Sequence, residues 1–94
     1  MGYRTAKRNI LKALKEGNFQ HESRGDIDVK NLLAMGKVSA KEVAALIAAS
    51  DGTMHVQSPH HIVKEVVVHI IKVNGWYIKF YFLEPDAWFI SVHK

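Results

Sequence analysis

Residues 66–94 read VVVHIIKVNGWYIKFYFLEPDAWFISVHK, and this stretch decides the fold. β-Branched and aromatic residues fill it on both sides of Asn74-Gly75, a dipeptide that favours the type I′ turn of a two-residue hairpin loop. Further along, Glu84-Pro85-Asp86 groups three more residues that favour turns. The stretch therefore predicts three antiparallel strands, at about residues 62–73, 76–83 and 87–93.

The register of the first hairpin follows from its loop. If Asn74 and Gly75 form the loop, Lys72 pairs with Tyr77, and successive side chains point to opposite faces of the sheet. One predicted face is apolar apart from a single histidine, and it carries Val67, His69, Ile71, Val73, Trp76, Ile78, Phe80 and Phe82. The other face includes lysines and tyrosines, and it carries Val66, Val68, Ile70, Lys72, Tyr77, Lys79, Tyr81 and Leu83.

The length of the second loop decides where His93 lies. If the loop is Pro85-Asp86, His93 joins the apolar face and Trp88 leaves it. If the loop is Glu84-Pro85-Asp86, the apolar residues stay together and the cross-strand pairs are Phe82–Trp88, Phe80–Ile90, Ile78–Val92, Lys79–Ser91 and Tyr77–His93. Burying apolar surface stabilises by ~25 cal/mol per Å². We therefore expect the three-residue loop, which buries more apolar surface and leaves His93 opposite Tyr77.

Helices are expected before the strands. The predicted helices span residues 6–16, 29–35 and 40–49, with N-caps at Thr5, Asp28 and Ser39. Ser39-Ala40-Lys41-Glu42 is a capping box, and Gly17 suits the C-cap of the first helix. Residues 18–26 predict a short strand or a loop, and residues 53–57 leave the same two alternatives open. Helices followed by an antiparallel meander predict one α+β domain over residues 1–94, with the N-terminal helices on the apolar face and the other face partly open.

Composition limits the function classes. The chain has 94 residues, 48% of them hydrophobic, which is enough for one core. It has no cysteine, which excludes disulfides, thiolate zinc sites and cysteine nucleophiles. The net charge of +4 is compatible with a polyanionic or acidic partner. No apolar run approaches the ~18–20 residues of a membrane span, and the N-terminus lacks the apolar core of a signal peptide, so we expect a cytoplasmic protein without membrane contact.

Known nucleotide-binding and hydrolase motifs are missing from the sequence. It has no P-loop, dinucleotide fingerprint, nucleophile elbow or HExxH, and we expect no cofactor.

The mixed face predicts a chemistry that needs no cofactor. Cleaving RNA without a metal requires removal of a proton from the 2′-hydroxyl, protonation of the leaving 5′ oxygen and stabilisation of charge on the phosphorus. His93 suits the proton transfer, and Lys79 and Lys72 suit the phosphate. Tyr77 and Tyr81 can orient a phosphate or stack on a base. The ordinary alternative is that these lysines and tyrosines simply line the solvated face of a sheet.

The other histidines lie in different settings along the sequence. His60-His61 and His55 suggest a metal site, but no acidic residue is placed to complete it, so we expect no metal. His61 is the better active-site candidate because its segment ends where the sheet begins. His69 falls on the apolar face and is expected to be a hydrogen-bonded core residue, while His21 lies in a polar segment and indicates little. The first helix also carries a stripe of basic residues, namely Arg4, Lys7, Arg8, Lys12 and Lys15. Such a stripe is usually a solvated face, and its alternatives are an extension of the RNA-binding surface or a site for an acidic partner.

The closing strands resemble a known family. Gly75-Trp76-Tyr77-Ile78-Lys79-Phe80-Tyr81, followed by Trp88-Phe89-Ile90-Ser91-Val92-His93, is similar to the C-terminal end of MqsR-type toxins, which are small mRNA interferases of bacterial toxin–antitoxin systems. An N-terminal basic helix opening with Arg4-Thr5 and a histidine-containing segment before the strands fit the same order. The resemblance spans most of the chain, and its specific part is the last 20 or so residues.

The resemblance implies a fold, an activity and a partner. It implies a RelE/barnase-like α+β fold, metal-independent cleavage of mRNA without the ribosome, and neutralisation by a cognate antitoxin protein. By position, Tyr77 matches the family's active-site tyrosine and His93 replaces a basic residue near the C-terminus. Lys64 falls near a family glutamine, and His55 is the titratable residue nearest to a family lysine that has no clear match.

The expected site therefore has two groups of residues. The catalytic residues are expected to be Tyr77, His93, Lys79 and His61, and the RNA-binding residues Lys64, Lys72, Tyr81, Ser91 and His55. Two other functions remain open, namely a non-catalytic module that binds RNA or a protein with the same face, and a small structural or regulatory protein.

Overall fold

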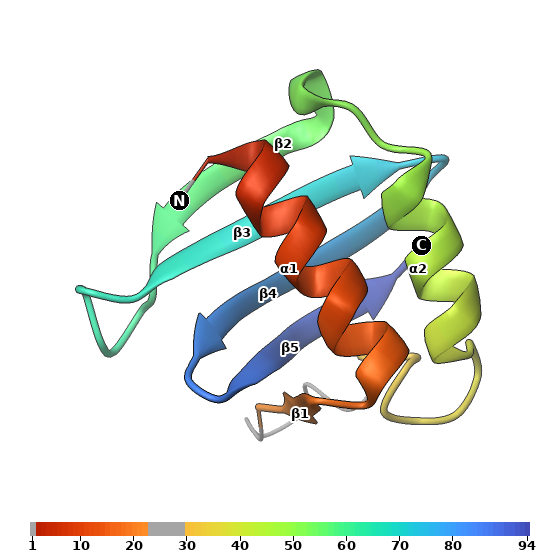
Figure 1. Cartoon of the computed structure of the whole chain (residues 1–94), viewed down its shortest axis with the longest axis horizontal. Coiled ribbons are helices and arrows are strands. Elements are labelled where there is room, and N and C mark those ends of the chain that lie inside the picture. Colours follow the sequence, from red (N-terminus) through yellow and green to blue (C-terminus); the bar gives the residue numbers. More distant parts are fainter. Residues whose placement is uncertain (1, 23–29) are drawn as a thin grey trace.

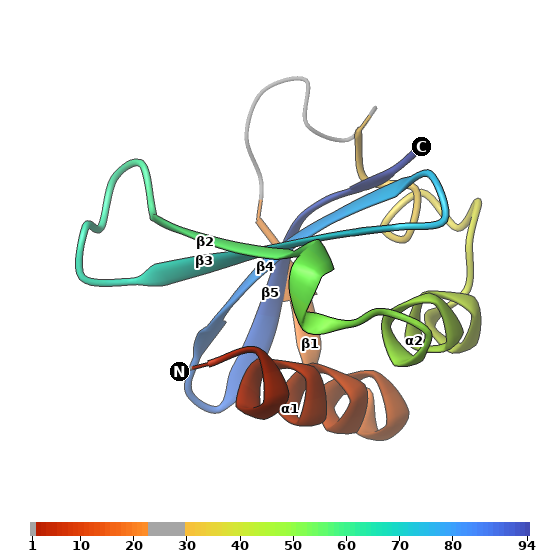
Figure 2. The same cartoon turned by 90° about the horizontal axis from the view of Figure 1, so that it is seen from above.

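A computed structural model describes residues 2–22 and 30–94, which form two helices packed on one face of a mixed sheet (Figures 1 and 2). The sheet has five strands in the order β1-β5-β4-β3-β2. The elements are α1 (Tyr3–Glu16), β1 (Phe19–His21), α2 (Ala40–Ala48), the 3-10 turn η2 (Gly52–Met54), β2 (His55–Pro59), β3 (Val67–Val73), β4 (Trp76–Leu83) and β5 (Asp86–His93). The predicted α+β class is confirmed. The sheet is larger than the predicted meander because β2 is added at one edge and β1, parallel to β5, at the other.

The first helix is confirmed, with an earlier start. α1 begins at Tyr3 after Gly2, so the prediction that Thr5 caps it is wrong and Thr5 lies inside its first turn. Gly17 ends the helix at φ 76°, a left-handed conformation that glycine adopts without a steric penalty. Ile10, Ala13 and Leu14 are buried, as their helical spacing predicts.

The middle of the chain differs from the prediction at one helix. In α2 the capping box is present, since the Ser39 hydroxyl accepts from the Glu42 N–H and the Glu42 carboxylate accepts from the Ser39 N–H. The expected helix at residues 29–35 is not α-helical in its described part. Asn31 there forms a bridge with Val92, and its side-chain oxygen accepts from the Ala34 N–H, which holds a turn instead. Asp28 lies outside the described residues.

The register of the first hairpin is confirmed throughout. Lys72 pairs with Tyr77 and Val73 with Trp76, around a loop in which Asn74 and Gly75 both have positive φ, at 50° and 79°. Such angles are what a type I′ turn requires. β3 starts at Val67, later than expected.

The second loop has two residues, but they are not the pair Pro85-Asp86 of the two-residue alternative. Leu83 pairs with Asp86, so the loop is Glu84-Pro85, and a bulge opposite Lys79 and Phe80 restores the register further along β5. The pairs Tyr77–His93, Ile78–Val92 and Lys79–Ser91 are confirmed, while Phe82–Trp88 and Phe80–Ile90 are wrong and are replaced by Phe82–Ala87, Tyr81–Trp88 and Phe80–Phe89.

The bulge increases apolar burial. It puts Phe89 into the core under the helices and Ile90 into a second cluster on the other face, and both side chains are fully buried. The three-residue loop would instead have left Phe89 on the open face. Because the bulge adds one residue to β5, it breaks the strict alternation of side chains, so that Phe89 and Val92 both face the helices while Ile90 and Ser91 between them face the other side.

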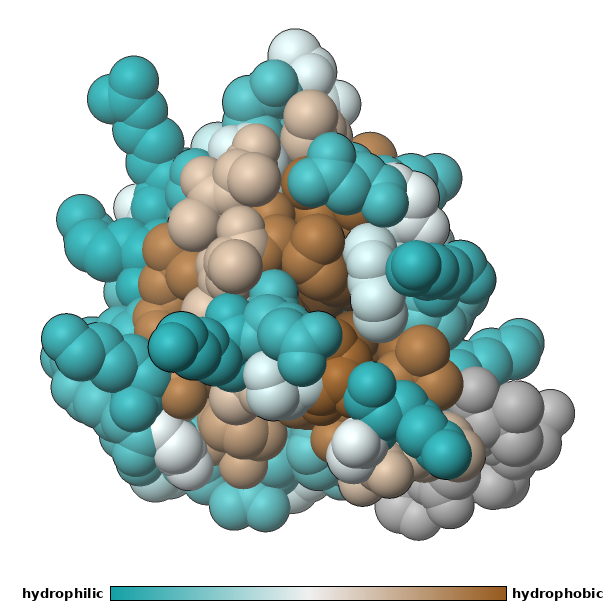
Figure 3. Space-filling view, turned by 90° about the vertical axis from the view of Figure 1, so that its right-hand side faces the viewer, coloured by the Kyte–Doolittle hydropathy of each residue, from teal (hydrophilic) through white to brown (hydrophobic). Residues whose placement is uncertain are grey.

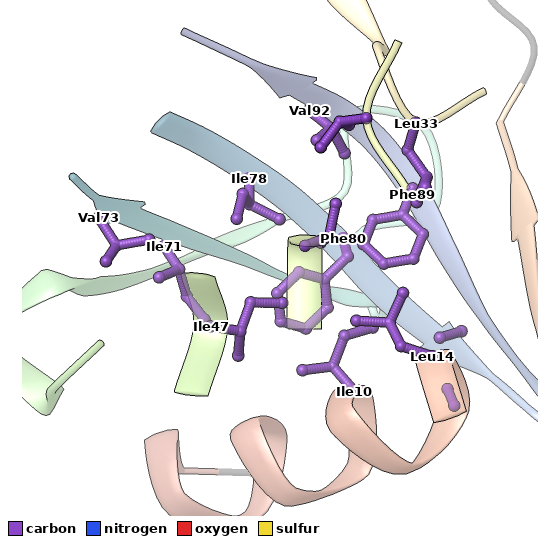
Figure 4. Close-up of a cluster of buried hydrophobic side chains, with 14 residues drawn as sticks. Ile10, Leu14, Leu33, Ile47, Ile71, Val73, Ile78, Phe80, Phe89 and Val92 are labelled. Carbon is purple, nitrogen blue, oxygen red and sulfur yellow. The ribbon is translucent and has the colours of Figure 1, made fainter. Parts of the chain in front are cut away.

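The main core lies between the sheet and the helices. Figure 4 shows Ile10 and Leu14 of α1 and Ile47 of α2 pointing toward the buried rings of Phe80 and Phe89. In residues 2–22 and 30–94, neither helix has the length and apolar character that a membrane span requires.

Candidate functional site

Tyr77 and His93 form a stacked pair on the face of the sheet opposite the helices. They are direct neighbours on β4 and β5, with ring centroids 5.2 Å apart and ring planes 23° from parallel. Nδ1 of His93 lies 2.9 Å from the main-chain oxygen of Lys94. Because a carbonyl oxygen only accepts, Nδ1 carries the hydrogen, and Nε2 of the neutral ring carries the lone pair. The pair therefore presents a proton acceptor beside a phenol hydroxyl.

Two lysines lie next to this pair. Lys72 is opposite Tyr77 on β3, with Nζ 5.9 Å from the centre of the tyrosine ring. Lys79 lies two residues along β4 on the same face and pairs with Ser91. Ser91 is buried, so it supports the surface rather than offering a reactive group. We call Lys72, Tyr77, Lys79, Ser91 and His93 the Tyr77 face.

The Tyr77 face combines the groups that a phosphate ligand requires. Its two ammonium groups attract a phosphate, and no carboxylate belongs to the set. The aromatic pair offers a surface for stacking, and His93 offers a base whose orientation is fixed by its bond to Lys94. The face therefore has the parts for binding and reacting with a phosphodiester.

Tyr81 lies on the same side of the sheet but is covered. Only 7% of it is exposed, its ring stacks on Trp88 at 6.3 Å, and its hydroxyl donates to Oε1 of Glu22 at 3.1 Å. Such a buried ring is not available to stack on a base, so the expected RNA-binding role of Tyr81 has no geometric support. Its position in the second buried cluster, with Val68 and Ile90, is structural.

His60 completes a network with Glu22 and Tyr81. Its Nε2 donates to Oε1 of Glu22 at 2.6 Å, while Nδ1 accepts from the N–H groups of Ile62 and Val63. Both ring nitrogens therefore form hydrogen bonds, and His60 links the β2–β3 loop to Glu22, the residue that follows β1. Sequence reasoning missed Glu22, because no local pattern connects it with a residue 38 positions away.

His61 and Lys64 lie away from the Tyr77 face. Both are exposed in the β2–β3 loop, and the His61 ring packs at 4.7 Å against His60. That loop is at the Tyr81 end of β4, four residues from Tyr77, which corresponds to about 13 Å along a strand. The structure therefore does not bring the expected catalytic His61 together with Tyr77.

His55 lies on the opposite side of the sheet. It pairs with Ile71, on the helix face, and its Nε2 is 2.9 Å from Nδ1 of His69. Burial lowers the pKa of His55, and burial together with the neighbouring His55 lowers the pKa of His69 to about 4. The prediction of His69 as a hydrogen-bonded core residue is confirmed, and His55 belongs to that structural pair rather than to the Tyr77 face.

The structure also shows the contacts of His21 and of Lys7 in the basic stripe. Nδ1 of His21 is 3.0 Å from the amide nitrogen of Asn31, and burial lowers the pKa of this histidine. On α1, Lys7 donates to the carbonyl oxygens of Ala48 and Ser50 at the end of α2, so one member of the basic stripe is structural. Within the part of the chain that the structure describes, no group of three or more histidine or acidic side chains is arranged to hold a metal.

Comparisons with known proteins found no relative of this chain. No protein-family model, curated protein or solved structure matches this chain. The Tyr77 face itself therefore has to support any statement about function.

Proposed function

We propose that this protein is a metal-independent endoribonuclease that cleaves mRNA at the Tyr77 face. The observation that carries the proposal is the stacked pair of Tyr77 and His93, in which the bond to Lys94 leaves Nε2 of the histidine as the proton acceptor. A histidine in this state can remove the proton from a 2′-hydroxyl near neutral pH.

The other side chains complete the reaction. The ammonium groups of Lys72 and Lys79 stabilise the charge that develops on the phosphate oxygens. The Tyr77 hydroxyl orients the phosphate, and it or a lysine ammonium protonates the leaving 5′ oxygen. The 2′ oxygen forms a bond to phosphorus as the bond to the 5′ oxygen breaks, giving a 2′,3′-cyclic phosphate and a 5′-hydroxyl end.

Within this proposal the protein is a cytoplasmic toxin of the MqsR type, with a RelE/barnase-like fold and a cognate antitoxin protein as its partner. The support is the helix-then-meander architecture and the likeness of residues 75–93 to the end of that family. The Tyr77 position, which matches the family's active-site tyrosine, is the position that stacks on His93.

Cleavage by the purified protein tests the proposal. Wild-type protein incubated with a mixed-sequence RNA in EDTA should shorten the RNA, and induced expression in a bacterium should stop growth and create new mRNA ends. Soluble protein that leaves both RNA and growth intact would contradict the proposal.

A second function is favoured by one specific observation, namely that His93 is the only histidine of the Tyr77 face. A face with two lysines and one aromatic pair also suits an RNA- or protein-binding module without catalysis. Binding of RNA that weakens steeply with salt, without any shortening of the RNA, would identify this alternative.

A further inference from the structure

We infer that a pocket beside Trp76 is a nucleobase subsite that prefers bases with an exocyclic amino group. The inference deepens the proposed function and rests on it, because it assigns to this pocket a neighbouring nucleotide of the RNA bound at the Tyr77 face. The pocket lies between α2 and the β3–β4 turn and has a volume of about 330 Å³. Its lining residues are Val38, Glu42, Ala45, Leu46, Asn74 and Trp76.

The pocket has the composition of a small-ligand site. Val38, Ala45 and Leu46 give it apolar walls, and half-buried Trp76 adds a flat aromatic surface. Ligand sites are typically apolar with a few polar groups that fix orientation. Figure 3, which looks onto the side of the molecule that carries α2, shows apolar side chains gathered at its centre and hydrophilic ones around them. A nucleobase, which is flat and polar only at its edge, suits such a site.

Two polar side chains are placed to read the edge of a base. Oε1 of Glu42 is held by the Ser39 N–H at 3.4 Å and by the Ser39 hydroxyl at 3.1 Å, which leaves Oε2 to accept from a ligand. The carboxamide of Asn74, at the tip of the hairpin, offers a donor and an acceptor. A carboxylate accepts hydrogen bonds and donates none, so it favours an amino group over a carbonyl at the same position of a base.

The pocket, on the helix side of the sheet, and the Tyr77 face, on the opposite side, lie at the same end of the sheet. Trp76 of the pocket directly precedes Tyr77 in β4, and Lys94 directly follows His93 at the end of β5. Lys94 places Nζ 5.5 Å from the centre of the Trp76 ring, where its charge meets a phosphate entering the pocket. An RNA strand that crosses this end of the sheet passes from His93, past Lys94, to Trp76.

Binding can be measured without cleavage. The chain has two tryptophans, so Trp88→Phe leaves Trp76 as the sole indole fluorophore, while Phe keeps a ring against Tyr81. Cytidine and uridine monophosphate are a matched pair of probes, since they differ by an amino group in place of a carbonyl. We expect cytidine monophosphate to quench Trp76 saturably and uridine monophosphate to bind about tenfold more weakly.

Two conservative variants test whether the Glu42 carboxylate and the Asn74 carboxamide contact the base. Glu42→Gln preserves the capping box, which accepts either residue, and Asn74→Asp preserves a turn that accepts either Asn-Gly or Asp-Gly. Glu42→Gln should remove most of the preference for cytidine, and Asn74→Asp should weaken both nucleotides. Circular dichroism of each variant confirms that the fold is retained.

The outcomes separate this inference from the proposed function. Equal or absent quenching by the two nucleotides would overturn the subsite, and so would an unchanged preference in Glu42→Gln, whether or not the wild-type protein cleaves RNA. Quenching by N-acetyl-leucinamide without any response to cytidine monophosphate would also overturn it and assign the pocket to a protein partner. Selective nucleotide binding by a protein that cleaves no RNA would support the subsite and contradict the nuclease.

Discussion

The ring of His93 stacks on that of Tyr77 at 5.2 Å, and its Nδ1 is held 2.9 Å from the main-chain oxygen of Lys94. The stack fixes the plane of the imidazole ring, and the hydrogen bond fixes its rotation and tautomer. Nε2 is therefore held in one position on a surface with two lysines, which is the arrangement that a general base requires.

Replacement of His93 by alanine should lower the rate of RNA cleavage by about a hundredfold or more, the usual contribution of a general acid or base. The fold should persist, because His93 lies at the end of β5 and is half-exposed. Single-turnover cleavage in EDTA measures the effect. His61→Ala is the matched control, since it removes an exposed histidine at the other end of the sheet. Equal losses in the two variants would contradict the assignment of His93.

Tyr77→Phe keeps the aromatic stack and removes only the hydroxyl. We expect slower cleavage with nearly unchanged RNA affinity, because the stacking surface and both lysines remain. Filter binding and single-turnover rates measured on the same RNA separate the two quantities. Wild-type cleavage by Tyr77→Phe would show that the hydroxyl takes no part in the reaction.

Replacement of Lys72 or Lys79 by methionine should weaken RNA binding and make it less sensitive to salt. Each phosphate contact that is lost should reduce the slope of log affinity against log salt by about 0.7 for single-stranded RNA. The exposed Lys41 of α2 provides a control, since Lys41→Met removes the same charge far from the Tyr77 face. A slope that falls as much in the control as in the other variants would indicate only a general effect of net charge.

Tyr81→Phe tests the structural assignment of Tyr81. The change removes a hydroxyl that donates to Glu22, and a hydrogen bond to a charged group contributes about 1.5–3 kcal/mol. The free energy of unfolding in urea should fall by roughly that amount. RNA affinity should stay at the wild-type level, whereas a loss of affinity without loss of stability would restore Tyr81 to the RNA-binding surface.

His69 should make the protein less stable in acid. Its pKa is lowered to about 4 in the folded state, below its unfolded value of about 6.5, so the unfolded chain binds more protons between these pH values. The free energy of unfolding should therefore be greatest above pH 6.5 and fall as the pH drops toward 4, by on the order of 3 kcal/mol in total. The lowered pKa of His55 acts in the same direction.

Urea unfolding of wild-type protein and His69→Gln at pH 7 and pH 5 measures this contribution. The variant should lose less stability than the wild type between the two values, because glutamine does not titrate. An identical pH dependence in both proteins would mean that His69 is not held neutral in the folded state.

Much of the sheet could be predicted because its signals are local. Asn74-Gly75 determined a loop of two residues, and alternation then determined every pair of the first hairpin. The capping box at Ser39 located the start of α2 for the same reason.

The other parts depend on tertiary contacts. In β5, Trp88, Phe89 and Ile90 are all apolar, so alternation alone does not say which of them enters the helix-side core. Both faces of the sheet are buried at this point, so the bulge can place Phe89 in the core under the helices and Ile90 in the cluster on the other face. His93 keeps its place opposite Tyr77 because the shorter loop and the bulge compensate each other.

In the candidate site, too, the pairs within the hairpins could be predicted, whereas contacts with distant elements could not. The Tyr77–His93 and Lys79–Ser91 pairs follow from the strand pattern and are confirmed. The covering of Tyr81 by Glu22 and His60 depends on the parallel pairing of β1 with β5, which no short sequence signal indicates. His55 is an RNA-binding candidate only through its place near a family lysine, and the pairing of β2 with β3 that puts it on the helix side is not indicated by any local sequence signal.

The most direct test of the proposed chemistry is an analysis of RNA ends after incubation of the wild-type protein in EDTA. A short RNA with one mapped cleavage position should yield a 2′,3′-cyclic phosphate and a 5′-hydroxyl, and the same RNA with a 2′-deoxy substitution at that position should stay intact. Cleavage of the deoxy-substituted RNA, or no cleavage of either RNA, would contradict a reaction in which His93 activates the 2′-hydroxyl.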